Sequence, residues 1–74
     1  MNRLRQVRPK ELIAALKRAG FAEAGQIGSH RILVDEKRNL QTSVPVHPGD
    51  VARGLLKKIL KQASLTEEDF KKLL

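Results

Sequence analysis

The stretch HRILVDEKRNLQTSVPV, residues 30–46, decides the fold. Residues 30–34 are mostly aliphatic and β-branched, which favours a strand, and the polar residues 35–39 that follow are typical of a hairpin loop. In residues 40–46, apolar or β-branched side chains alternate with polar ones, as in a strand with one buried face. The inward positions of that strand would be Leu40, Thr42, Val44 and Val46. Because Pro45 cannot donate a ladder hydrogen bond, we expect this strand to lie at a sheet edge or to end there.

Upstream of the hairpin, apolar residues at helical spacing predict a helix that begins near Pro9 and stops at Gly20. Pro9 suits the first helical turn, and Arg8 is a poor N-cap, which leaves the start open by a residue or two. Residues 21–26 carry a thin pattern that favours a first strand of weak propensity.

Downstream, apolar residues between positions 51 and 63 predict a second helix with a basic outer face. Asp50 is a competent N-cap for it. Gly54 would cost about 1 kcal/mol relative to Ala inside a helix, so we expect the helix to begin after Gly54. Thr66 is expected to cap a short C-terminal helix.

These elements predict an α+β fold of order α-β-β-β-α, with a three-stranded antiparallel sheet, two helices on one of its faces and a short C-terminal helix. A chain of 74 residues is too short for two separate apolar cores. We therefore expect residues 1–74 to form a single domain.

The composition indicates an anionic partner. Fifteen Lys and Arg against eight Asp and Glu leave a net charge of +7, which favours binding to nucleic-acid phosphates. With two Phe and no Trp or Tyr, the chain lacks the exposed rings on which single-stranded bases stack in recognition-motif sheets. Cysteine is absent, which excludes disulfides and thiolate-ligated zinc.

No apolar run is long enough for a membrane span, and the N-terminal residues 1–6 lack the apolar segment of a signal peptide. We expect a soluble, cytoplasmic protein that does not associate with a membrane.

Few residues offer catalytic chemistry. The acidic residues do not converge in a pattern suited to a metal nuclease, and a zinc site built on His30 and His47 would lack a third ligand, so we expect no metal and no cofactor. The remaining candidate for catalysis is a single histidine side chain that acts without a metal. Imidazole titrates near neutral pH and is able to take a proton from a ribose 2′-hydroxyl, which then attacks the adjacent phosphorus. At this stage an ordinary hydrogen-bonded residue is the simpler interpretation of His30, and His47 is equally consistent with a turn residue at the strand end.

Three short motifs, in this order and at these separations, resemble the HicA family of toxin ribonucleases: Gly28-Ser29-His30, Val44-Pro45-Val46-His47 and Ile59-Leu60-Lys61-Gln62-Ala63. The resemblance covers roughly residues 8–70. It implies a double-stranded-RNA-binding-domain-like fold, which agrees with the predicted order of elements. It also implies an mRNA-cleaving toxin that is neutralised by a HicB-type antitoxin covering the active surface.

By the same resemblance, His30 occupies the position of the catalytic histidine, Gly28 shapes the preceding turn and Ser29 lies beside it. No catalytic role is carried over to His47. At the end of the second helix, Ala63-Ser64-Leu65 replaces the usual glycine of the family.

Charge and placement, rather than the resemblance, suggest the phosphate contacts. They would be Lys10, Arg31, Lys57 and Lys61, whose simpler interpretation is as solvated surface cations. Two other functions stay open: a non-catalytic double-stranded-RNA-binding module, and a small basic interaction subunit.

Overall fold

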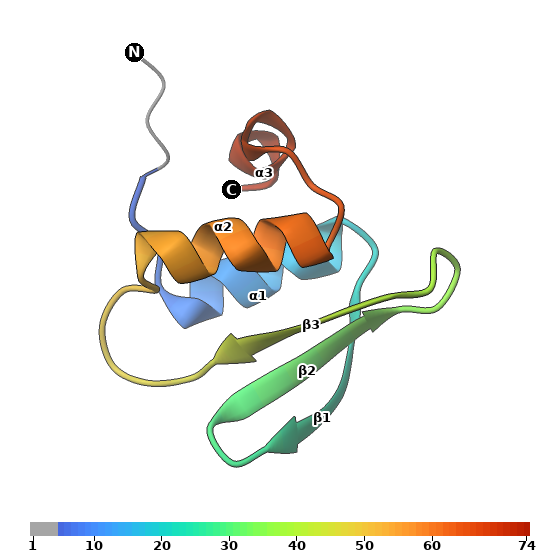
Figure 1. Ribbon diagram of the computed structural model, residues 1–74, viewed down its shortest axis with the longest axis horizontal. Helices are drawn as coiled ribbons and strands as arrows, with labels where there is room; N and C mark the ends of the chain where they lie inside the picture. The colour runs from blue at the N-terminus through green and yellow to red at the C-terminus, as the bar shows by residue number, and fades with distance from the viewer. Residues whose placement is uncertain (1–4) are drawn as a thin grey trace.

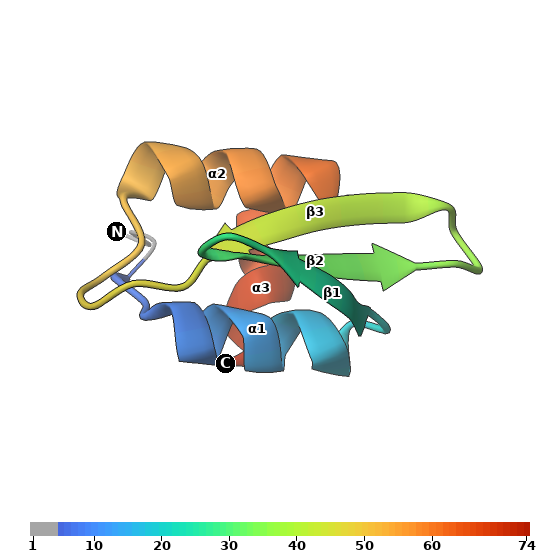
Figure 2. The same ribbon diagram turned by 90° about the horizontal axis from the view of Figure 1, so that it is seen from below.

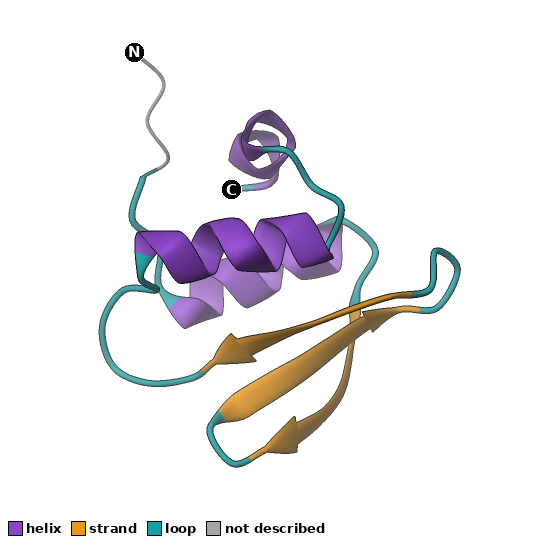
Figure 3. Cartoon of the chain, in the orientation of Figure 1, coloured by secondary structure: helices purple, strands orange, loops and turns teal. Residues whose placement is uncertain are grey.

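The computed structural model describes residues 5–74, so residues 1–4 of the segment searched for a signal peptide lie outside it. The order of elements is α-β-β-β-α-α, as predicted (Figures 1 and 3). The elements are α1 (Pro9–Arg18), β1 (Ala22–Ile27), β2 (His30–Asp35), β3 (Leu40–Pro45), α2 (Arg53–Gln62) and α3 (Glu67–Leu73).

The three strands form one antiparallel sheet in the order β1-β2-β3, which makes β2 the central strand. The first residue of β2, His30, pairs with Ile27 of β1 and with Pro45 of β3. The prediction from Pro45 is confirmed, since β3 lies at an edge and ends at this residue. The other edge strand, β1, is exposed along its whole length and carries a bulge between Glu23 and Gly25.

Both α1 and α2 pack on one face of the sheet, which confirms the expected double-stranded-RNA-binding-domain-like arrangement (Figure 2). Alternate strand residues fill the space beneath them, because successive side chains on a strand point to opposite faces. α3 packs against both α1 and α2 and adds the largest fully buried side chain, Phe70. The core includes Leu12, Ala15 and Leu16 of α1, Leu33 of β2, Val44 of β3, and Leu56, Ile59 and Leu60 of α2.

Both long helices end in the same way. In α1, the N–H of Phe21 bonds to Leu16 O at 3.0 Å and the N–H of Gly20 bonds to Lys17 O at 3.1 Å, with Gly20 at φ 112°. In α2, the N–H of Leu65 bonds to Leu60 O at 2.9 Å, and Ser64 stands where α1 has Gly20, at φ 56°. These bonds are typical of the Schellman motif, a common helix C-terminus that favours glycine at its left-handed residue. Ser64 therefore adopts a conformation that glycine adopts more easily.

The structure corrects the bounds of several predicted elements. β1 begins at Ala22 and reaches Ile27, because Phe21 closes the α1 stop and packs in the core. Asp35 belongs to β2 and is buried, whereas it was assigned to the hairpin loop. α2 begins at Arg53, before Gly54.

The early start of α2 has a physical reason. Gly54 lies in the first helical turn, is exposed, and a Cβ placed there would meet nothing within 4 Å. The penalty of about 1 kcal/mol for glycine is the value for a helix interior, and the first turn lies outside that interior. The residue at the N-cap is Ala52, not Asp50, and it makes no side-chain capping bond.

Candidate functional site

His30 is held by backbone bonds on both sides. The two-residue turn Gly28-Ser29 leads from β1 into β2, and Gly28 takes φ 59°, a left-handed conformation that suits glycine. Ser29 O accepts a hydrogen bond from the N–H of Val46 at 2.6 Å, which ties this turn to the segment after β3. The position of His30 is therefore fixed from both sides, by the preceding strand β1 and by the more distant segment at the end of β3.

The His30 side chain lies on the face of the sheet opposite the helices. In β2, Leu33 and Asp35 are buried toward the helices, so alternation places Arg31 on that face and His30 on the open one. His30 is exposed, and its ring makes no hydrogen bond to any residue between positions 5 and 74. A ring sealed in the core could not reach a phosphodiester; this one is accessible to a polymer lying on the open face.

His47 follows Val46, whose N–H bonds to the Gly28-Ser29 turn, but it is placed differently from His30. It follows β3, is exposed, and its Nδ1 lies 3.0 Å from Pro48 O, as suits a turn residue. Among the described residues, no cluster of three or more His, Asp or Glu side chains is placed to hold a metal ion.

Arg31 is next to His30 in sequence but contributes to a different surface. On the helix side of the sheet, a groove of about 460 Å³ runs between α1 and the start of β2, and we call it the α1 groove. Lys10 and Arg31, two of the predicted phosphate contacts, both line it. The other lining residues are Ile13, Ala14, Lys17 and Val46.

Lys17 and Glu23 were not identified from the sequence as site residues. Glu23 of β1 accepts from Arg31 Nη1 at 2.6 Å and from Lys17 Nζ at 2.8 Å, so one carboxylate bridges two cations of the α1 groove. Hydrogen bonds from Lys17 and Arg31 hold the pKa of Glu23 below its usual value. The sequence does contain a signal that could have identified Lys17. It lies seven residues after Lys10, which is about two helical turns, so both lysines lie on one side of α1.

The other two predicted phosphate contacts, Lys57 and Lys61, are exposed on α2 and do not line the α1 groove. The structure thus brings Lys10 and Arg31 together and leaves the α2 lysines on a separate helix.

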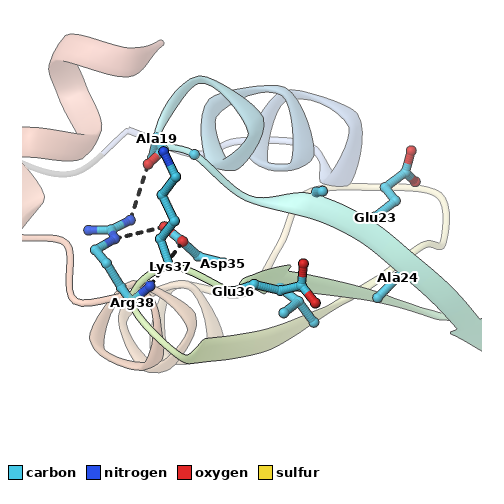
Figure 4. A pocket seen from close by; sticks show the side chains of 10 residues that line it. Ala19, Glu23, Ala24, Asp35, Glu36, Lys37 and Arg38 are labelled. Atoms are coloured by element: carbon cyan, nitrogen blue, oxygen red, sulfur yellow. Dashed lines mark hydrogen bonds and ion pairs between the residues drawn. The ribbon is translucent and has the colours of Figure 1, made fainter.

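A larger depression, of about 740 Å³, lies at the other end of β2 from His30 (Figure 4). Arg38 crosses it, donating to Asp35 Oδ2 at 2.7 Å and to Ala19 O at 3.1 Å. The hydrogen bond from Arg38 holds the pKa of Asp35 below its usual value. These bonds fasten the β2–β3 turn to the end of α1, so we assign this depression a structural role.

Comparison with known families decides the identity. A family model described as the HicA toxin of bacterial toxin-antitoxin systems matches residues 9–65, from the start of α1 to the end of the α2 stop. The chain belongs to the HicA toxin family. As a HicA toxin it has the toxin role in a toxin–antitoxin pair, and so a partner antitoxin of some kind. No curated protein matches the chain.

The match to the HicA family includes the open-face histidine and the α1 groove, whereas α3 lies beyond it. Within residues 5–74 of this HicA chain, no helix has the length and apolar character needed to cross a membrane.

Proposed function

We propose that this HicA chain is an endoribonuclease that cleaves mRNA with His30 as its catalytic residue, residues 1–74 acting as a single domain. The observation that carries the proposal is the His30 side chain, exposed and without a hydrogen-bond partner among residues 5–74, on the open face of a strand paired on both sides. A rigid backbone and an accessible ring are what a general acid or base needs.

In the proposed reaction, the His30 imidazole takes the proton of a ribose 2′-hydroxyl. The 2′-oxygen attacks the adjacent phosphorus, the bond from phosphorus to the 5′-oxygen breaks, and the leaving oxygen receives a proton from the imidazolium or from water. The products are a 2′,3′-cyclic phosphate and a 5′-hydroxyl. This route needs neither a metal nor a cofactor, and it needs RNA because DNA has no 2′-hydroxyl.

The neighbours of His30 support the geometry. Gly28 provides the turn, and Ser29 anchors that turn to the segment after β3 through its carbonyl. We propose that Lys10, Arg31, Lys57 and Lys61 contact the RNA backbone, where cations stabilise charge and release counterions. The net charge of +7 supports such binding.

We further propose that the partner is a HicB-type antitoxin that covers the open face of the sheet, and that the toxin acts in the cytoplasm, where mRNA is found. A cover over this face would exclude RNA from His30 without changing the fold.

The test is growth and transcript integrity in cells that express the chain, with His30→Ala as the variant and His47→Ala as its matched control. We expect His30→Ala to remain folded by circular dichroism, to bind RNA and to lose both growth arrest and transcript cleavage. His47→Ala should retain both activities. Persistent cleavage by His30→Ala would reject the assignment of His30. Absence of cleavage by the unaltered chain would favour a non-catalytic double-stranded-RNA-binding module or a small basic interaction subunit.

A further inference from the structure

The α1 groove has more positive charge than its own carboxylate neutralises. Lys10 and Lys17 approach it from α1 and Arg31 from β2, while Glu23 provides one negative charge. Lys10 makes no ion pair with any residue in the described part of the chain. The side chains of Lys17 and Arg31 are 48% and 39% exposed, so a second anion has access to both.

The floor of the groove suits a nucleotide backbone. Ala14 and Val46 provide apolar surface between the cations, above the buried Ile13, and a ribose ring is able to rest on it while its phosphate meets the charges. A free inorganic anion would gain nothing from that floor.

The groove and His30 lie at the same end of β2. Arg31 and His30 are consecutive, with Cα atoms about 3.8 Å apart and side chains on opposite faces. Gln26 joins the two sides, since it accepts from Arg31 Nε at 3.4 Å and donates to Gly28 O, in the turn before His30, at 3.0 Å. An RNA strand that passes around the Gly28-Ser29 turn would meet the α1 groove on one face of the sheet and His30 on the other face.

We propose that the α1 groove binds one backbone phosphate of the RNA substrate through Lys10, Lys17 and Arg31, and that Glu23 is an internal anion that competes with this phosphate. The inference rests on the proposed ribonuclease function, and it adds a site that positions the RNA substrate. Exposed ion pairs are weak, so an RNA phosphate is able to displace Glu23 from Lys17 and Arg31. Glu23 is charged at neutral pH, as an ordinary glutamate is, and it therefore competes with the phosphate there.

The experiment measures binding of the unaltered chain and its variants to a single-stranded 2′-O-methyl RNA, which lacks the nucleophilic hydroxyl, over a series of salt concentrations. The groove variant carries Lys10→Gln, Lys17→Gln and Arg31→Gln. Its control carries Lys37→Gln, Lys71→Gln and Lys72→Gln, which remove the same charge from the hairpin loop and from α3.

We expect the groove variant to bind several-fold more weakly than the control, with a salt slope shallower by roughly 0.7, the value for one phosphate contact to a single strand. Glu23→Gln should bind several-fold more tightly than Glu36→Gln, which removes the same charge from the hairpin loop. Equal affinity and slope in the two triple variants, or no gain for Glu23→Gln over Glu36→Gln, would overturn the proposal.

Cleavage of unmodified RNA by the unaltered chain is measured separately. If that cleavage occurs but the triple variants bind alike, the groove proposal alone is wrong. If the groove variant loses RNA affinity and no cleavage occurs, the groove holds phosphate and the proposed ribonuclease function is wrong. If the groove variant keeps its RNA affinity but releases the antitoxin, the groove serves the protein partner and the proposal is wrong.

Discussion

Replacing Phe70 by Ala tests whether α3 is part of the structural core, although it lies beyond the family match of residues 9–65. Phe70 is fully buried and joins the core formed by α1 and α2. A buried aromatic side chain removes about 150–250 Å² from water, which at about 25 cal/mol per Å² stabilises the fold by about 4–6 kcal/mol. Measured Phe→Ala changes in cores cost about 3–5 kcal/mol, so we expect a loss in that range.

That loss is large for a chain of 74 residues. At about 0.05–0.15 kcal/mol per residue, its whole free energy of unfolding is about 4–11 kcal/mol. Phe70→Ala should therefore lose a large share of the stability of the fold and be less toxic when expressed. The sheet that holds His30 would lose its support along with the two helices.

The assay is urea unfolding followed by far-ultraviolet circular dichroism, with Leu74→Ala as the matched control. Leu74 follows α3 and is 37% exposed. Its replacement by Ala should lower the free energy of unfolding by less than about 1 kcal/mol. A Phe70→Ala protein with a free energy of unfolding within about 1 kcal/mol of the unaltered chain would refute this reasoning and restrict the core to the matched residues.

Three other predictions follow from single features. Ser64→Gly should raise the free energy of unfolding by up to about 1 kcal/mol, because Ser64 has φ 56° at the helix end where α1 has Gly20. The control Ser43→Gly, in the extended strand β3, should lower the free energy of unfolding. A less stable Ser64→Gly protein and a more stable Ser43→Gly protein would contradict the left-handed conformation of Ser64. Because Arg38 depresses the folded-state pKa of Asp35, the resulting stability is present above the unfolded pKa of about 3.9 and is lost as the pH falls through the lower folded value. Acid titration of Asp35→Asn should thus show a smaller loss below about pH 5 than the unaltered chain, and an equal loss would argue against the pair. RNA cleavage should persist in excess EDTA, measured on gels, whereas abolition by the chelator would indicate a metal route.

Much of the fold follows from local patterns in the chain. The alternation that buries Thr42 and Val44, and the missing N–H of Pro45, predict the edge strand β3 from residues within one segment. The start of α2 was less predictable, because the propensity penalty of Gly54 applies to helix interiors and Gly54 lies in the first turn. The burial of Asp35 depends on Arg38 and on the end of α1, a contact that no periodicity encodes.

The candidate site, like the fold, was only partly predictable from the sequence. The sequence indicates His30, through its place after Gly28-Ser29, and a strand over residues 30–34 places His30 and Arg31 on opposite faces. Which of the two faces the helices cover follows only from the structure. The grouping of Lys17, Glu23 and Arg31 requires the pairing of β1 with β2 and the position of α1 over the sheet. Such contacts between distant segments come from tertiary structure, so charge and placement in the sequence suggested Lys57 and Lys61 with the same weight as Lys10.

The most direct measurement is the single-turnover rate at which the purified chain and its His30→Ala variant cleave an all-ribose RNA, and the same RNA with one 2′-deoxynucleotide at the cut site. If His30 activates the 2′-hydroxyl, the unaltered chain cleaves only the all-ribose RNA, and His30→Ala lowers that rate by roughly 10²–10⁴-fold. Cleavage at the deoxynucleotide by the unaltered chain, or an unchanged rate for His30→Ala, would contradict the mechanism.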